Sequence, residues 1–142
     1  MVDQGELELV HLCDATFQLR DPITISDTPL GTRMVFEVES GTVTGERLNA
    51  TVARGSASGD WTTLDQRGVA TLDVRLVLTT ADGAAVFSAY RGRADVFGGG
   101  PIYIAPTYDT GAEQYLWLNT VQAIGKGQLD RTTLTYRIFE AR

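Results

Sequence analysis

The chain has 142 residues, of which 43% are hydrophobic and 21% are charged, and its formal net charge is −6. These values are ordinary for a soluble globular protein, and the length predicts a single domain over residues 1–142. Acidic residues outnumber basic ones 18 to 12 without any basic run. This balance argues against nucleic acid or an anionic membrane surface as the partner.

The cysteine content and the first residues bear on the cellular compartment. Cys13 is the one cysteine, so no intramolecular disulfide can form, which fits a reducing environment. The first residues lack a basic region followed by an apolar core, and we expect no signal peptide. No apolar run approaches the roughly 20 residues of a membrane helix. We therefore expect a cytoplasmic protein.

Segments rich in Val, Thr, Leu, Phe and Tyr alternate with Gly, Asp and Pro along the whole chain, and this pattern predicts strands separated by turns. The expected strands are residues 7–20, 32–44, 48–54, 60–64, 69–80, 84–94, 103–108, 115–124 and 132–140. Between two of them, Asp82-Gly83 supplies the positive φ angles that a tight hairpin requires. No segment has the pattern of an amphipathic helix. The chain is therefore predicted to be all-β.

Many antiparallel strands without helices can form either a sandwich or a closed barrel. Long strands joined by short hairpins favour a single antiparallel up-and-down barrel, calycin-like, of about eight to nine strands, because closure removes the exposed sheet edges. The Gly98–Gly100 run lacks the lysine and the strand-to-helix setting of a phosphate-binding loop. We interpret it as a flexible lid or a plain loop.

Short motifs run in order along most of the chain. They are Thr42–Leu48, Gly59–Trp61, Leu72–Arg75, Asp82–Ala84, Tyr90–Gly92, Tyr108–Gly111 and Tyr115–Asn119. Their order resembles that of the family catalogued as domain of unknown function 3237, also called uncharacterised protein family 0311. The resemblance implies a small antiparallel β-barrel with a central cavity that self-associates, which we expect as a homodimer, and it implies no settled chemistry. Glu37, Glu39, Asp109 and the loop around Gly98–Gly100 depart from the family pattern, so no ligand is carried over.

Asp73 and Arg75 lie two residues apart in an alternating segment, so their side chains leave the same face about 6.6 Å apart. The opposite face carries leucines and Val74. Two interpretations of the position of this pair remain open. The pair lies outside in solvent and contributes no more than about 1 kcal/mol, or it lines a polar cavity while the leucines form the outer wall.

Glu37 and Glu39 have the same spacing, with Val35 and Val43 on their face of the expected strand. Two carboxylates in one cavity would repel each other, which raises the pKa of at least one and makes a general acid or base available. A solvated outer face would have the same sequence pattern.

Aromatic and amide groups gather in the motifs named above. Tyr115, Trp117 and Asn119 share one face of their expected strand, and Trp61 follows a Gly-Asp turn. Trp61, Trp117, Asn119, Tyr90 and Tyr108 are candidates for ligand binding, because a buried Trp, Tyr or Asn needs a hydrogen-bond partner that a ligand can supply. Ordinary core packing is the alternative for each.

His11 and Cys13 also fall on one expected strand face, but two ligands without a third do not make a zinc site. A Gly-x-Ser-x-Gly elbow and a dinucleotide fingerprint are both missing from the sequence. We therefore expect chemistry that needs no metal and no cofactor.

The leading hypothesis is a cofactor-independent isomerase, lyase or cyclase that acts on a small, partly apolar, oxygenated organic molecule inside the barrel. Glu39 or Asp73 would move the proton, and Arg75, Tyr90 and Asn119 would stabilise a developing enolate. Glu37, Trp61, Tyr108 and Trp117 would complete the ligand pocket. The alternatives are a non-catalytic barrel that holds a small hydrophobic ligand and a structural oligomer filled by its own side chains.

Overall fold

The computed structural model describes residues 2–142, which form an antiparallel sheet and one short 3₁₀ helix, η1. The elements are β1 (Leu9–Leu19), β2 (Ile23–Thr28), β3 (Gly31–Thr44), β4 (Ala50–Val52), β5 (Gly59–Leu64), β6 (Val69–Thr80), β7 (Ala85–Asp95), β8 (Ile102–Ile104), β9 (Thr107–Asp109), η1 (Glu113–Thr120), β10 (Ala123–Asp130) and β11 (Thr133–Ala141). Within the described residues, no helix has the length and apolar character needed to cross a membrane.

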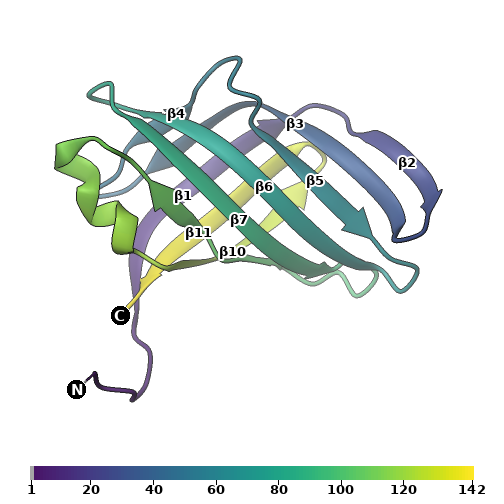
Figure 1. Cartoon of the computed structure of the whole chain (residues 1–142). Helices are drawn as coiled ribbons and strands as arrows, with labels where there is room; N and C mark the ends of the chain where they lie inside the picture. The colour runs from purple at the N-terminus through teal and green to yellow at the C-terminus, as the bar shows by residue number, and fades with distance from the viewer. Residues whose placement is uncertain (1) are drawn as a thin grey trace.

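Eight strands close into a barrel, with each one antiparallel to the next. The ring runs β1, β3, β5, β6, β7, β8, β10 and β11, and β11 pairs with β1 to complete it (Figure 1). The three remaining strands flank this ring: β2 pairs with β3, β4 bridges β3 and β6, and β9 pairs with β7. The ring follows chain order, so the prediction of an all-β, up-and-down barrel is confirmed.

Alternation along the strands decides what lies inside the barrel. On β6, Leu72, Val74, Leu76 and Leu78 are all buried, while the residues between them point outward. Each fully buried Leu or Val stabilises the fold by about 1.5–3 kcal/mol relative to an exposed one. The apolar face of this strand is therefore the inner face.

One end of the barrel is closed by η1, whose Leu118 is fully buried (Figure 1). The β6–β7 turn holds the helix, because Asp82 accepts a hydrogen bond of 2.8 Å from the Tyr115 hydroxyl. The guanidinium of Arg47 lies 4.2 Å from the centre of the Trp117 ring. The predicted tight turn at Asp82-Gly83 is present, and of its two central residues Gly83 has a positive φ, of +89°, while Asp82 does not.

The C-terminal third departs most from the predicted strands. The segment 115–124 was expected to be a strand, but residues Glu113–Thr120 form η1 and β10 begins only at Ala123. Tertiary hydrogen bonds hold the helix: Asn119 Oδ1 accepts from the Thr110 amide at 2.8 Å, and Asn119 Nδ2 donates to the Thr110 carbonyl at 3.0 Å. Tyr115, Trp117 and Asn119 consequently do not share a strand face.

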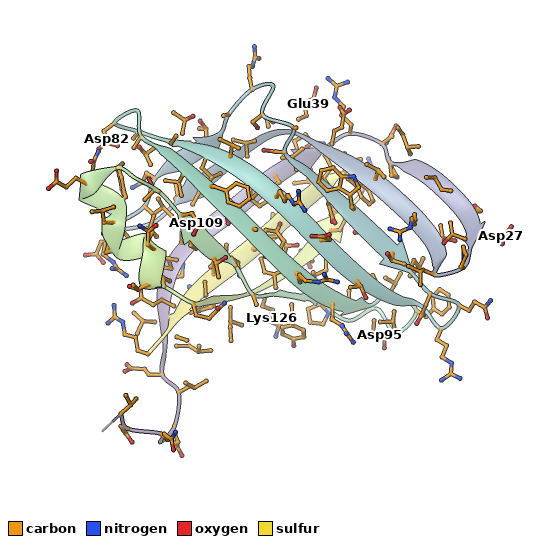
Figure 2. All side chains as sticks on the ribbon, in the orientation of Figure 1. Asp27, Glu39, Asp82, Asp95, Asp109 and Lys126 are labelled. Carbon is orange, nitrogen blue, oxygen red and sulfur yellow. The ribbon has the colours of Figure 1, made fainter. Side chains whose placement is uncertain are left out.

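Two further differences concern short strands. The expected strand 103–108 is divided into β8 and β9, with buried Pro106 between them, because proline cannot donate to a sheet ladder. No strand was expected at β2, whose polar residues lie on an exposed flanking hairpin that ends near Asp27 (Figure 2). Ile23 and Ile25 alternate with Thr24 and Ser26, but both Ile side chains are exposed, so the strand is held by its pairing with β3 and not by a buried face.

β-bulges change which residues face inward. A register shift between His11 and Cys13 leaves His11 exposed and Cys13 buried, so the expectation that they share a face is wrong. A second shift, where Gln18 and Leu19 pair with Ser40 and Val38, lies at Glu39. It puts Val43 inside the barrel although Glu37 lies outside, because one extra residue inverts the alternation.

Candidate functional site

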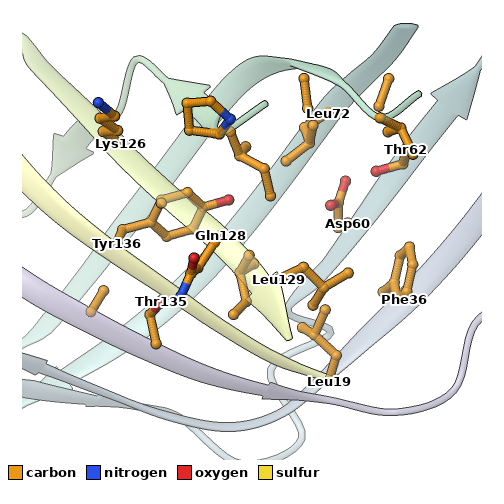
Figure 3. A pocket seen from close by; sticks show the side chains of 18 of the residues that line it. Leu19, Phe36, Asp60, Thr62, Leu72, Lys126, Gln128, Leu129, Thr135 and Tyr136 are labelled. Carbon is orange, nitrogen blue, oxygen red and sulfur yellow. The ribbon is translucent and has the colours of Figure 1, made fainter. Parts of the chain in front are cut away.

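A cavity of about 1140 Å³ lies at the end of the barrel opposite to η1. Figure 3 shows side chains that line it. The Gly99–Pro101 loop and the ends of β5 and β10 border its mouth. Six of its lining residues come from the outer wall, namely Asp14, Thr16, Lys126, Gln128, Thr135 and Arg137. The volume therefore combines the barrel interior with a groove on the outside of β1, β10 and β11.

The inner wall of this cavity is mainly apolar. Its inward side chains include Leu19, Met34, Phe36, Leu64, Ala70, Leu72, Ala94, Ile102, Leu129 and Leu134. Asp60, Thr62 and Tyr136 are the polar groups among the inward side chains in this part of the described chain. A mostly apolar cavity with a few converging polar groups is typical of a small-molecule site.

Asp60 is held by β5, where it alternates with exposed Trp61 and faces the cavity beside Thr62 (Figure 3). It is 5% exposed, and its Oδ1 accepts a hydrogen bond of 3.3 Å from the Asp73 amide on β6. Burial raises the pKa of Asp60 to about 6, with a further contribution from the charge of Asp73, although hydrogen bonds from Thr62 and the Asp73 amide act the other way. This carboxyl group can therefore exchange a proton near neutral pH.

Tyr136 projects from β11 toward the same space (Figure 3). Among residues 2–142, its hydroxyl is the one buried side-chain polar atom without a hydrogen-bond partner. Its ring packs edge-on against Tyr90 at 6.0 Å between centroids and against Phe17 at 6.4 Å. Burial first, and then the charge of Asp60, raises the pKa of Tyr136, so the phenol stays neutral and can donate a hydrogen bond.

Tyr90 is the one expected site residue that lies in the barrel interior beside this pair. It is 5% exposed, and its pKa is raised well above the ordinary value by burial, with smaller contributions from Tyr136 and Asp60. The Tyr90 and Tyr136 hydroxyls are close enough to influence each other's pKa, but no hydrogen bond of good geometry joins them.

The expected catalytic carboxylates lie outside the barrel instead. Glu37 and Glu39 are exposed, and Arg20 bridges them at 3.5 Å and 3.6 Å. Figure 2 shows Glu39 on the outside of the barrel. Asp73 and Arg75 occupy the outer face of β6, where Asp73 lies opposite Arg91. The expectation that these four side chains line the cavity is corrected, because the apolar face of each strand turns inward.

The remaining expected ligand residues have other surroundings. Trp61 is 42% exposed and packs on the outer wall opposite Val35. Trp117 lies under Arg47, and Asn119 clamps the Thr110 backbone, both at the closed end. Tyr108 is buried there beside Cys13, where burial raises its pKa well above the ordinary value. The structure does not bring these four residues to the cavity.

Asp60, Thr62 and Tyr136 were not singled out from the sequence. The signal for Tyr136 was present, since it alternates with Leu134 and Ile138 in a strand that was predicted. Asp60 begins the expected strand 60–64, but it also belongs to the Gly-Asp turn expected before Trp61, and Trp61 was named as the ligand candidate instead. Within residues 2–142, no three His, Cys, Asp or Glu side chains gather in a way that could hold a metal ion.

The closed ring, the internal cavity and its inward acid define a small calycin-like β-barrel with a candidate small-molecule site. The chain belongs to the family described as Protein of unknown function (DUF3237), whose model matches residues 7–141. This membership confirms the resemblance of the ordered motifs. A comparison with curated proteins found no match.

Solved structures of the same shape come from bacteria and a fungus. A β-barrel-like protein from Acinetobacter baumannii has a TM-score of 0.88 and 20% identity over 100% of both chains. A protein of unknown function from Clostridium acetobutylicum has a TM-score of 0.86 and 21% identity, over 96% of this chain and 100% of its own. An enzyme from Penicillium herquei has a TM-score of 0.77 and 20% identity, over 100% of this chain and 99% of its own. At these identities the likeness establishes a shared fold.

Proposed function

We propose that the protein is a cofactor-independent enzyme of the isomerase, lyase or cyclase type, which moves a proton on a small oxygenated organic molecule bound in the barrel. The observation that carries this proposal is the buried Asp60 carboxyl, with a pKa raised to about 6, in a cavity that also holds the unpartnered Tyr136 hydroxyl. The similarity in fold to the Penicillium herquei enzyme is consistent with catalysis.

Asp60 takes the role of general base or acid. Above its pKa the ionised carboxylate can remove a proton from a carbon next to a carbonyl, or from a hydroxyl group. Below its pKa the same group can return a proton. A carboxyl group with a pKa near the working pH makes both transfers accessible. Glu39, Asp73 and Arg75 lie on the outer face, and we do not assign them this role.

Tyr136 takes the role of oxyanion donor, with Tyr90 as its packing support. A neutral phenol in an apolar wall donates to the oxygen on which negative charge develops, and removal of one such donor typically costs about 10²–10³ in rate. The unpartnered hydroxyl gives up no internal hydrogen bond when it binds a ligand oxygen. Enolisation, dehydration, retro-aldol cleavage and ring closure all use this pair of roles.

Exchange of carbon-bound hydrogen tests the proposal without knowledge of the natural substrate. We expect the protein to accelerate deuterium incorporation next to the carbonyl of 2-tetralone in D₂O, followed by NMR. Asp60→Asn is expected to slow the exchange by about 10²–10⁴, and Tyr136→Phe by about 10²–10³. Exchange in the Asp60→Asn variant at the wild-type rate would contradict the proposal.

A non-catalytic carrier is the second candidate, and the apolar lining of the cavity favours it. A carrier would bind 2-tetralone without accelerating exchange, and Tyr136→Phe would weaken binding without any effect on a rate. We also retain as proposals the homodimer and the cytoplasmic location that the sequence led us to expect.

A further inference from the structure

The charged groups of the protein are divided unequally between the inside and the outside of the barrel. All 12 Lys and Arg side chains, together with His11, belong to exposed residues. Asp60 is the charged group that faces the cavity from the inner wall of the described chain. Buried Glu140 lies at the closed end and is already paired with Arg47 and Arg142.

The two cations that border the cavity belong to its outer groove. Lys126 and Arg137 lie directly opposite each other on neighbouring strands β10 and β11, and both point away from the barrel interior. The Lys126 ammonium lies 5.9 Å from the centre of the Tyr103 ring, and the Arg137 guanidinium lies 5.5 Å from that of Phe139. Neither cation is placed to neutralise a charge on a ligand beside Asp60.

We propose that the barrel selects its ligand by charge: it admits neutral, largely apolar molecules that carry a hydroxyl or carbonyl oxygen, and it rejects carboxylate and phosphate anions. An anion inside would lose its hydration without gaining a cationic partner, and it would also be repelled by Asp60. This inference rests on the proposed function for the identity of the site, but it makes a separate prediction about binding.

The polar groups of the cavity define where the ligand oxygen lies. The Tyr136 hydroxyl is buried without a partner, and a buried hydroxyl left unpaired costs about 1–3 kcal/mol. A ligand oxygen that accepts from Tyr136 removes this cost, and the Asp60 carboxyl faces the same space. Around them, Phe36, Leu72 and the other apolar residues favour a hydrocarbon skeleton without further polar groups.

The test uses 2-naphthamide and 2-naphthoate, which match in shape and differ in charge. At about pH 8, where Asp60 is ionised, we expect calorimetry to give 2-naphthamide an affinity about 100-fold higher or more than that of 2-naphthoate. Competition locates the binding: 2-naphthoate held only in the outer groove would not displace 2-naphthamide. Displacement by 2-naphthoate at equal concentration, tighter binding of 2-naphthylmethylammonium than of 2-naphthamide, or no binding of 2-naphthamide would overturn the inference.

The Asp60→Asn variant removes the repulsion while keeping the size of the side chain. We expect the preference for 2-naphthamide over 2-naphthoate to narrow at least about tenfold, since one like-charge contact is lost. Asp109→Asn, which removes an exposed carboxylate on β9, is the matched control and should keep the full preference. An unchanged preference in the Asp60→Asn variant would overturn the inference.

A pH series on the wild-type protein supplies the same information if the variant does not fold. Lowering the pH from about 8 to about 5 protonates Asp60, whose pKa is about 6. This should narrow the preference for 2-naphthamide over 2-naphthoate, as the Asp60→Asn variant is expected to do. The titratable groups that face Asp60 are Tyr90 and Tyr136, which stay neutral, and Asp73 across the wall. A preference that does not change with pH would contradict charge selection.

The two proposals can fail separately. Selective binding of 2-naphthamide without exchange of 2-tetralone would leave charge selection intact and would remove catalysis. Exchange of 2-tetralone that depends on Asp60, together with equal binding of 2-naphthamide and 2-naphthoate, would support catalysis and remove charge selection.

Discussion

The two ends of the barrel satisfy their polar groups to different degrees. At the closed end, η1 is anchored by Asp82 and Asn119, and Glu140 accepts from two arginines. At the open end, the Tyr136 hydroxyl has no partner and the Asp60 carboxyl is buried with a raised pKa. Buried polar groups are normally satisfied, so the unsatisfied Tyr136 hydroxyl supports the proposed ligand site at the open end.

The largest effect on stability is expected at the closed end. Leu118→Ala should lower the free energy of unfolding by about 2–5 kcal/mol, because Leu118 is fully buried in the helix that covers the core. Chemical denaturation measures the change. Leu116→Ala on the same helix is the control, since Leu116 is 46% exposed and should cost much less. Equal losses for both variants would mean that η1 does not seal the barrel.

Asp60→Asn should stabilise the protein at neutral pH, although it removes the proposed base. The Asp60 pKa rises from 3.8 to about 6 on folding, so stability falls as the pH rises from about 4 to about 6, by about 3 kcal/mol in total. The loss is complete about one pH unit above the folded-state pKa. The variant should lack this fall in denaturation midpoints measured across the pH range. The stability of the wild type relative to the variant should therefore fall over this pH interval. A rise in this relative stability would contradict the raised pKa of Asp60.

Glu140 should contribute with the opposite sign. The hydrogen bond from Arg142, followed by the hydrogen bond and the charge of Arg47, lowers the pKa of Glu140 despite its burial. Its contribution is therefore present above the ordinary glutamate pKa and is lost as the pH falls through the lowered value. Glu140→Gln should cost about 1–2 kcal/mol at neutral pH, because it weakens two charge-assisted hydrogen bonds.

Thermal unfolding of the Glu140→Gln variant at several pH values measures this contribution. The difference from wild type should shrink at low pH, where both side chains are neutral. A difference in stability that grows toward low pH would show that the contacts of Glu140 with Arg47 and Arg142 do not depend on the carboxylate charge.

The smallest effect is expected on the outer wall. Glu37→Gln should change stability by no more than about 0.5 kcal/mol, since its contact with Arg20 is exposed and lies at 3.5 Å. Thermal unfolding at low and at high salt measures the effect, and 2-naphthamide affinity should stay the same. A loss of ligand affinity would restore this residue to the site that the sequence suggested.

The sequence alone determined the all-β class, the up-and-down barrel and the family. These follow from local signals: alternation in segments such as β6, turn residues such as Asp82-Gly83, and motifs in a fixed order. Alternation also separated Asp73 and Arg75 from the leucines of β6. Whether the charged or the apolar face turned inward was left open, because both a solvated barrel and a polar cavity have that pattern.

Only the tertiary structure decided the site. The bulge at Glu39 and the shift between His11 and Cys13 changed which residues face inward, and such shifts depend on the partner strand. η1 replaced an expected strand because Asp82, which is distant in sequence, and the nearby Thr110 hydrogen-bond to it. Asp60 and Tyr136 are 76 residues apart (136 − 60) and face one cavity only because the ring closes. Closure is a long-range pairing, and no local pattern encodes which two side chains it brings together.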